Sequence, residues 1–216
     1  MAATCVVYSE KGGVGKTTLA YSLARDLGTY YFTNDSNIDQ KLIDAYPEAI
    51  PLGSKIELIE DTNAVYDLSK DTGGIISAKM VEIFENSDIV IVPTLFDINS
   101  VQGTLNTLDT LSQLNLKHVR LVVNRYKESE KELEKKIIEI INQKLHEISE
   151  RAVTELVYNE NFTVQTIRES KIVLNASWHA RSILEEYEKA LPVIKIAYRG
   201  VVDDYSELIK KIREVI

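Results

Sequence analysis

The residue types and spacing best suited to chemistry occur in residues 9–18, which read S-E-K-G-G-V-G-K-T-T. The glycines allow the backbone to turn several N–H groups toward one anion. Lys16 would then reach the β and γ phosphates of a nucleotide, and the Thr17 hydroxyl would bind Mg²⁺. The segment therefore predicts a phosphate-binding loop. Its expected ligand-binding residues are Gly12, Gly13, Val14, Gly15, Lys16, Thr17 and Thr18.

The sequence on either side predicts the two elements that position this loop. Residues 4–8, T-C-V-V-Y, form a short apolar run of β-prone residues. Behind the loop, Leu19, Leu23 and Leu27 recur at helical spacing until Gly28 ends the pattern. The loop is therefore expected between a strand and a helix, where the positive end of the helix dipole also attracts phosphate.

The loop departs from the usual pattern G-x-x-x-x-G-K-[ST] at its first position, where this chain has Glu10. The segment that begins at Lys11, K-G-G-V-G-K-T-T, resembles the deviant Walker A loop of the ParA/MinD superfamily of ATPases. The resemblance implies ATP and Mg²⁺ as cofactors. It also implies that Lys11 reaches across a dimer interface to the partner's nucleotide, so that Lys11 and Lys16 both serve catalysis.

Acidic residues after the second expected strand supply a candidate for positioning water. Residues 33–40 read T-N-D-S-N-I-D-Q, where ParA-like proteins usually carry D-x-D-P-Q. By this partial resemblance Asp35 orients the hydrolytic water, and Asp39 is the alternative. Aspartates and asparagines also form simple turns, which is the competing interpretation. One of the two aspartates of the family motif is missing here, which is compatible with slow ATP hydrolysis.

Two aspartates compete for the role of the Mg²⁺-linked carboxylate. Asp67 directly ends the apolar run 64–67. Asp71 begins D-T-G-G, which is similar to the family's D-T-P-P-G, and it precedes Asp88 by 88 minus 71, or 17 residues, as is usual in the family. We favour Asp71 on this two-part match and keep Asp67.

A third polar group ends the expected strand 119–124. The sequence N-R-Y at this strand end resembles the segment that reads the adenine ring in ParA-like ATPases, with Asn124 and Arg125 as the binding residues. The Asn124 amide would pair with a ring nitrogen and with the exocyclic amine. The alternative is that Asn124 only caps the following turn.

Short apolar strands alternate with amphipathic helices, which predicts an α/β fold with a mainly parallel, twisted sheet and helices on both faces. Residues 1–216 are expected to form a single ParA-like P-loop ATPase domain. The expected strands are residues 4–8, 30–33, 55–59, 64–68, 89–93, 119–124 and 154–158. Beyond the first helix, apolar residues share helical faces in residues 76–84, 101–111, 133–148 and 205–216.

Composition limits the compartment and the chemistry. The chain has 216 residues and one cysteine, Cys5, so it has no internal disulfide, and a dimer could not supply four thiolates to an iron–sulfur cluster. Cys5 is expected to be a small buried apolar residue. The sequence contains no run of 18 apolar residues and no signal peptide pattern, so a cytoplasmic location is expected.

Charge bears on the partners. The net charge is −8, and residues 151–216 hold ten Lys/Arg and ten Asp/Glu, so the excess acid lies in residues 1–150. This balance does not favour DNA binding, although basic residues clustered in three dimensions would still form a basic face. The candidate DNA contacts are Arg168, Lys171, Arg181, Lys210 and Lys211.

The C-terminal part of the chain bears on membrane binding. Residues 205–216 lack Phe and Trp and mix acids with bases, so they are expected to form a closing helix on the sheet and not a membrane anchor. Trp178 is expected to be a half-buried aromatic near a helix start.

The function that the resemblance implies is an ATPase switch that forms a homodimer on binding Mg-ATP and positions plasmids, chromosomes or other cargo. Hydrolysis would be slow and stimulated by a ParB-like or other protein partner, and non-specific DNA is a further candidate partner. Two alternatives remain: a MinD-like membrane-associated ATPase, and a metabolic ligase resembling dethiobiotin synthetase.

Overall fold

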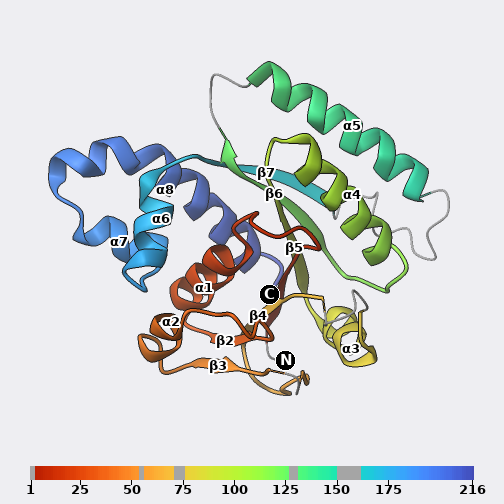
Figure 1. Ribbon diagram of the computed structural model, residues 1–216, viewed down its shortest axis with the longest axis horizontal. Coiled ribbons are helices and arrows are strands. Elements are labelled where there is room, and N and C mark those ends of the chain that lie inside the picture. The colour runs from red at the N-terminus through yellow and green to blue at the C-terminus, as the bar shows by residue number, and fades with distance from the viewer. Residues whose placement is uncertain (1–2, 54–55, 71–75, 127–130, 150–161) are drawn as a thin grey trace.

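The computed structural model describes residues 3–53, 56–70, 76–126, 131–149 and 162–216. Within these ranges seven strands form one parallel sheet, in the order β3-β2-β4-β1-β5-β6-β7 (Figure 1). The strands are β1 (Thr4–Tyr8), β2 (Tyr30–Thr33), β3 (Ala49–Pro51), β4 (Ala64–Leu68), β5 (Ile89–Thr94), β6 (Val119–Tyr126) and β7 (Phe162–Arg168). The predicted parallel α/β fold is confirmed.

Helices cover both faces of this sheet (Figure 1). Side chains alternate between the faces along each strand, so Val7 of β1 packs in the core on the α1 side and Val6 in the core on the α3 side. One face is covered by α1 (Lys16–Leu27), α2 (Gln40–Asp44), α6 (Lys171–Trp178), α7 (Ile183–Lys189) and α8 (Pro192–Arg213). The other is covered by α3 (Ala78–Asn86), α4 (Ile98–Leu111) and α5 (Lys131–Ser149).

The order of the strands places the predicted loop at a point where ligands bind in such sheets. From β1 the chain crosses through α1 to β2, whereas from β4 it crosses through α3 in the opposite direction to β5. Because β1 and β4 are neighbours, their carboxyl ends open on a crevice between diverging connections. The residues that follow β1 and β4 therefore meet at one edge of the sheet.

Both edges of the sheet differ from the prediction. Residues 56–59 are not a strand: Ile56 is buried in the core, and the Ile59 N–H donates to the Tyr66 hydroxyl at 2.9 Å, so the apolar pattern reflects packing and not pairing. The short β3, which was not predicted, forms the edge beside β2. The expected strand 154–158 lies outside the described residues, and β7 forms the other edge.

The last helix begins earlier than predicted, at Pro192, but its closing role is confirmed. Its later turns bury Tyr205, Leu208 and Ile212 in the core on the α1 side of the sheet. The expectation for Trp178 is wrong: this residue ends α6, is 79% exposed, and lies with its ring 5.7 Å from the Lys41 ammonium. The α6 helix turns only Ile172 and Ala176 inward, which leaves the indole on its outer face.

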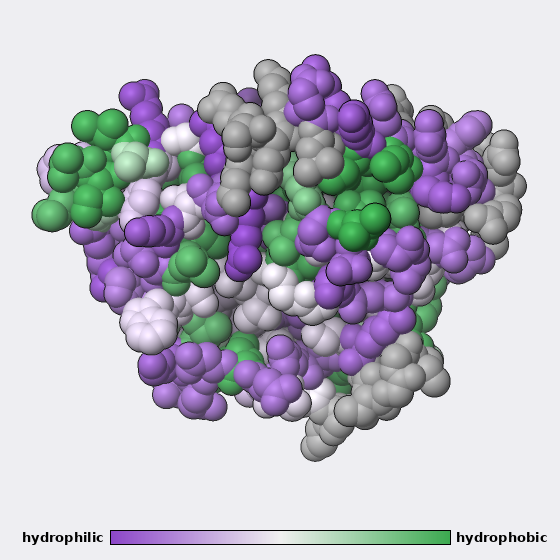
Figure 2. Space-filling model, turned by 45° about the horizontal axis from the view of Figure 1, so that its top comes forward, coloured by the Kyte–Doolittle hydropathy of each residue, from purple (hydrophilic) through white to green (hydrophobic). Residues whose placement is uncertain are grey.

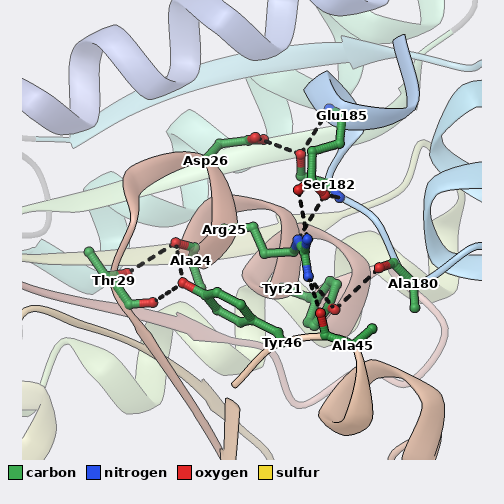
Figure 3. A network of polar contacts seen from close by, with 10 residues as sticks. All are labelled: Tyr21, Ala24, Arg25, Asp26, Thr29, Ala45, Tyr46, Ala180, Ser182 and Glu185. Atoms are coloured by element: carbon green, nitrogen blue, oxygen red, sulfur yellow. Dashed lines mark hydrogen bonds and ion pairs between the residues drawn. The ribbon is translucent and has the colours of Figure 1, made fainter. Parts of the chain in front are cut away.

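A polar network fastens the far end of α1 (Figure 3). The Arg25 guanidinium donates to both carboxylate oxygens of Glu185 on α7, at 2.6 and 2.8 Å, and to the Ala45 carbonyl at the end of α2. Next to it, the Ser182 hydroxyl donates to Asp26. These contacts hold α1 between α2 and α7, and so fix the direction in which its N-terminus points.

Candidate functional site

The loop between β1 and α1 has the backbone that its glycines predict. Gly13 and Gly15 have left-handed φ angles of 80° and 83°, which residues other than glycine rarely adopt. Gly15 is also the N-cap of α1 and makes no side-chain cap. The first N–H groups of the helix, from Lys16 onward, are therefore left without a side-chain acceptor, as an anion site requires.

Lys16 begins α1 and makes a buried ion pair with Asp67 of β4. The Lys16 ammonium lies 2.5 Å from Asp67 Oδ1, and the Asp67 side chain is fully buried. The second oxygen, Oδ2, accepts a hydrogen bond from the Tyr31 hydroxyl at 2.8 Å. A buried carboxylate needs such partners, because an unpaired charge inside a protein is costly. The competing candidate, Asp71, lies outside the described residues.

Glu10, which stands where the usual motif has glycine, fastens the loop to its surroundings. Its backbone N–H donates to the Thr107 hydroxyl of α4 at 3.1 Å, and its carboxylate accepts from the Thr110 hydroxyl at 2.9 Å. The same carboxylate pairs with the Lys70 ammonium at 2.8 Å. Where the usual motif has glycine, this chain therefore has a side chain that joins the loop to α4 and to the segment after β4.

The additional lysine, Lys11, also lies against α4. A Cβ placed on Gly103 would come within 2.9 Å of the Lys11 Cβ and 3.4 Å of its Cγ, so the helix admits this side chain only because residue 103 is glycine. Asp97 caps the same helix by accepting from the Ser100 N–H and hydroxyl. Those hydrogen bonds, and to a smaller extent the Lys11 charge, lower the Asp97 pKa.

The two candidate aspartates after β2 make local hydrogen bonds. Asp35 Oδ1 accepts from the Asn37 N–H at 2.9 Å, and Asp39 caps α2 by accepting from the Lys41 N–H at 3.0 Å. Among the hydrogen bonds of the described residues, neither carboxylate reaches residues 9–18. The assignment of Asp35 to water positioning stays a prediction.

Asn34, the residue before Asp35, was not identified from the sequence. Its amide donates to the Ser69 carbonyl at 2.8 Å and accepts from the Ser69 N–H at 2.7 Å. This two-point bond joins the chain after β2 to the chain after β4 and so shapes the edge where Asp67 lies. No sequence pattern distinguishes it from the neighbouring turn residues.

Asn124, at the end of β6, contacts the loop directly. Its amide nitrogen donates to the Val14 carbonyl at 2.8 Å, and a Cβ on Gly15 would lie 3.1 Å from the same nitrogen. Gly15 is thus required both by its φ angle and by the close approach of Asn124. Arg125 follows with a left-handed φ of 57° and is exposed.

Beside this contact lies a cavity of about 520 Å³. It is bounded by the loop, by the ends of β6 and β7, and by α6. The β7 side was missed by the sequence analysis because that strand was not predicted. The lining residues are Val14, Gly15, Thr18, Leu19, Asn124, Arg125, Ile167, Arg168, Glu169, Ser170, Lys171, Val173, Leu174 and Ile183.

The cavity suits a nucleotide base next to a loop that suits its phosphates. The volume is within the range of small-molecule sites, and an amide and several basic side chains share the lining with apolar groups. Gly15, which has a left-handed φ and is the N-cap of α1, is itself part of the lining. The structure therefore brings together Val14, Gly15, Thr18, Asn124 and Arg125, five of the predicted binding residues.

Other features of the surface limit or extend the candidate roles. Among the described helices, none combines the length and apolar character needed to cross a bilayer. Cys5 is buried in β1 as expected, and burial raises the pKa of its thiol to about 12. Exposed apolar side chains gather where α7 leads into α8, at the left of the space-filling view (Figure 2): Leu191, Val193, Ile194 and Ile196.

Comparison with protein families shows that residues 5–165 match the CobQ/CobB/MinD/ParA nucleotide binding domain. No curated protein matches the chain by sequence.

Solved structures with similar folds include the MinD cell division protein of Aquifex aeolicus, at a TM-score of 0.60 and 16% identity, covering 97% of this chain and 98% of that one. An ATP complex of a Cyanothece McdA variant gives 0.57 and 13%, with 100% and 97% covered. The pnob8 ParA gives 0.59 and 11%, with 99% and 98% covered.

Proposed function

This chain belongs to the CobQ/CobB/MinD/ParA family of nucleotide-binding domains, and from that premise we propose that it is a dimerising ATPase switch of the ParA type. One observation carries the proposal. A glycine loop with two lysines, Lys11 and Lys16, leads into an uncapped helix N-terminus beside a cavity of base size. The McdA–ATP complex among the similar folds supports ATP as the ligand.

The residues present fit Mg-ATP. The N–H groups of the loop and the first turn of α1 would hold the phosphates, with Lys16 on the β and γ groups. Thr17 and Asp67 would hold the Mg²⁺, which supplies charge neutralisation on the phosphate oxygens when bound. Lys16 would then exchange its present partner, Asp67, for phosphate, which leaves the carboxylate available. Asp71 stays an alternative for this role.

The base would occupy the cavity beside Asn124. One N–H of the Asn124 amide donates to the Val14 carbonyl, and the amide oxygen would accept from the exocyclic amine of adenine. Guanine presents a carbonyl at the same place and would be disfavoured. The second N–H of the amide would donate to a ring nitrogen, as expected from the sequence.

Hydrolysis would require two more residues. Asp35 would orient the water, a role supported by its position two residues after Thr33, which is paired in register with Asp67. Lys11 would reach the nucleotide of a second copy of the chain. Both lysines and Asp35 would then act together only in the ATP-bound homodimer, and hydrolysis would return the chain to the monomer.

The partner that stimulates hydrolysis is proposed to be a protein of ParB-like or other type. The charges give limited support for DNA. Arg168 pairs with Asp204, Arg181 with Glu186 and Lys211 with Glu207, so these three candidate contacts each face an acidic neighbour. DNA binding, where it occurs, is expected to be weak and sensitive to salt.

The test is size-exclusion chromatography with light scattering, in Mg-ATP and in Mg-ADP. The wild type is expected to be dimeric with ATP and monomeric with ADP. Lys16→Ala should lose nucleotide binding, and Lys11→Ala should bind ATP but stay monomeric. A dimeric Lys11→Ala would contradict the cross-interface role. Adding non-specific DNA at low and raised salt then distinguishes a DNA partner from a protein partner.

One observation favours a second candidate, a membrane-associated positioning ATPase. Val193 and Ile196 at the start of α8 are 73% and 78% exposed, and the basic residues beside them are Lys189, Arg199 and Lys195, which pairs with Glu188. Exposed apolar residues with basic neighbours are typical of helices that lie on anionic membranes. ATP-dependent sedimentation with anionic vesicles, lost in Ile196→Glu, would support it.

A further inference from the structure

Tyr31 is a buried polar residue in the middle of β2. Its side chain is inaccessible to solvent and lies on the face of the sheet that α1 covers. The register of β2 and β4 explains why Tyr31 lies near Asp67. Thr33 pairs with Asp67, and Tyr31 lies two residues before Thr33. Because side chains alternate along a strand, Tyr31 and Asp67 lie on the same face of the sheet. The Tyr31 hydroxyl therefore reaches Asp67 Oδ2, at 2.8 Å.

The hydroxyl has no packing reason to be there. A phenylalanine at position 31 would fill the same space without a hydroxyl. The next residue, Phe32, packs in the core on the opposite face of the sheet in this way. Burying a hydroxyl costs free energy unless it is hydrogen-bonded, so its use is the bond to Asp67. A phenol carries its proton at neutral pH, so the Tyr31 hydroxyl is the donor in this bond and the carboxylate the acceptor.

The ring is also held in place. Tyr21 of α1 packs edge-on against it, with ring centroids 5.5 Å apart and planes at 86°. The Tyr21 hydroxyl in turn accepts from Arg25, in the network that fixes α1 (Figure 3). A fixed ring fixes the direction of the hydroxyl, and with it the plane of the Asp67 carboxylate.

We propose that Tyr31 is a positioning residue for the Mg²⁺ site: it occupies Oδ2 of Asp67, so that only Oδ1 is presented to the loop. In the present structure Oδ1 pairs with Lys16. If Lys16 paired with phosphate instead, Asp67 would keep Tyr31 as a buried donor on Oδ2, and Oδ1 would be the oxygen available to hold the Mg²⁺. The proposal rests on the proposed function, because it assigns Asp67 to the Mg²⁺ of a bound nucleotide.

The test compares Tyr31→Phe with Tyr66→Phe, which removes a buried hydroxyl from the neighbouring strand that bonds the Ile59 N–H and not Asp67. Binding of a fluorescent ATP analogue is followed as Mg²⁺ is titrated, and again in EDTA. Losing one hydrogen bond to a buried carboxylate is expected to raise the half-saturating Mg²⁺ concentration about three- to tenfold in Tyr31→Phe. Affinity in EDTA should stay within about twofold of the wild type, and Tyr66→Phe should match the wild type throughout.

The outcomes separate the two proposals. If the wild type shows no Mg²⁺-dependent nucleotide binding, the proposed function fails, and the role of Tyr31 fails with it. If the wild type binds but Tyr31→Phe has an unchanged Mg²⁺ midpoint, only the role of Tyr31 is overturned. An equal shift in Tyr66→Phe, or an equal loss of affinity in EDTA, also overturns it, because either would be a general effect on the fold. Melting temperatures establish that both variants are folded.

Discussion

Lys11 and Gly103 are in direct contact: a Cβ on Gly103 would lie 2.9 Å from the Lys11 Cβ. Gly103 shares one side of α4 with Thr107 and Thr110, which hydrogen-bond to Glu10. This side of the helix thus holds Glu10, which replaces the first glycine of the usual pattern, and the additional lysine, Lys11. Any displacement of α4 would also move the lysine proposed to cross the dimer interface.

Gly103→Ala tests this contact. The added methyl group displaces the Lys11 side chain at its Cβ, which cannot move without its backbone, while alanine itself favours the helix by up to about 1 kcal/mol. We expect the monomer to fold and bind ATP, and the ATP-dependent dimer to weaken about tenfold or more, as measured by analytical ultracentrifugation. Asn106→Ala, on the exposed side of α4, is the control. Equal dimer affinities in the two variants would contradict the prediction.

The Lys16–Asp67 pair predicts a stability effect separate from nucleotide binding. Lys16→Ala leaves the buried Asp67 carboxylate without its cation and is expected to destabilise the unliganded protein by about 3 kcal/mol. Adding Asp67→Asn removes the unpaired charge. The loss of unfolding free energy in the double variant should therefore be smaller, by about 1–3 kcal/mol, than the sum of the losses in the two single variants. Urea unfolding of all four proteins measures this coupling, and strict additivity would show that the pair does not form.

Asp26 predicts a dependence of stability on pH. Burial is the main reason that its pKa is raised from 3.8 to about 6. The folded state therefore binds this proton more tightly than the unfolded state, so the contribution is fully present below pH 3.8 and is lost as pH rises through 6. Asp26→Asn should remove this loss of stability with rising pH and raise the free energy of unfolding at pH 7 by on the order of 1–3 kcal/mol.

Thermal unfolding between pH 4 and 8 measures the effect of Asp26→Asn. Asp109→Asn, at an exposed position of α4, is the matched control and should follow the wild type. A wild-type profile parallel to that of Asp26→Asn would show that Asp26 does not titrate differently in the two states.

Asn124 predicts base selectivity. Asn124→Ala removes the bond to the Val14 carbonyl and the amide oxygen proposed to accept from adenine. We expect about a fivefold loss of ATP affinity, for one hydrogen bond, with little change for GTP. Isothermal titration with both nucleotides measures the ratio. Parallel losses for ATP and GTP would mean that Asn124 only supports the loop and does not read the base.

The sequence alone determined the features that depend on neighbouring residues. The loop and the helix after it follow from glycines whose left-handed angles the structure contains, and α1 ends at Gly28, also left-handed, as predicted. The strands β1, β2 and β4 have the predicted bounds. Local periodicity and backbone freedom fix such features without reference to the rest of the chain.

The edges of the sheet were less predictable. The strand β3 is three residues long and contains Pro51, so its composition carries almost no β signal. Residues 56–59 carry an apolar pattern yet cover the core without joining the sheet. An edge strand has one partner instead of two, so the local sequence of β3 is weakly constrained. The other edge strand, β7, was missed although its sequence, F-T-V-Q-T-I-R, is rich in β-branched residues.

Only the tertiary structure decided which distant side chains meet. Asp67 is 51 residues from Lys16 and 36 from Tyr31, and nothing in the spacing of these residues selects them. They meet because β4 lies between β1 and β2, an order set by the packing of helices on both faces of the sheet and not by any local pattern. The same packing brings Gly103 against Lys11 and Asn124 against Val14. The sequence therefore determined the glycine loop between β1 and α1, whereas the strand order determined which residues surround it.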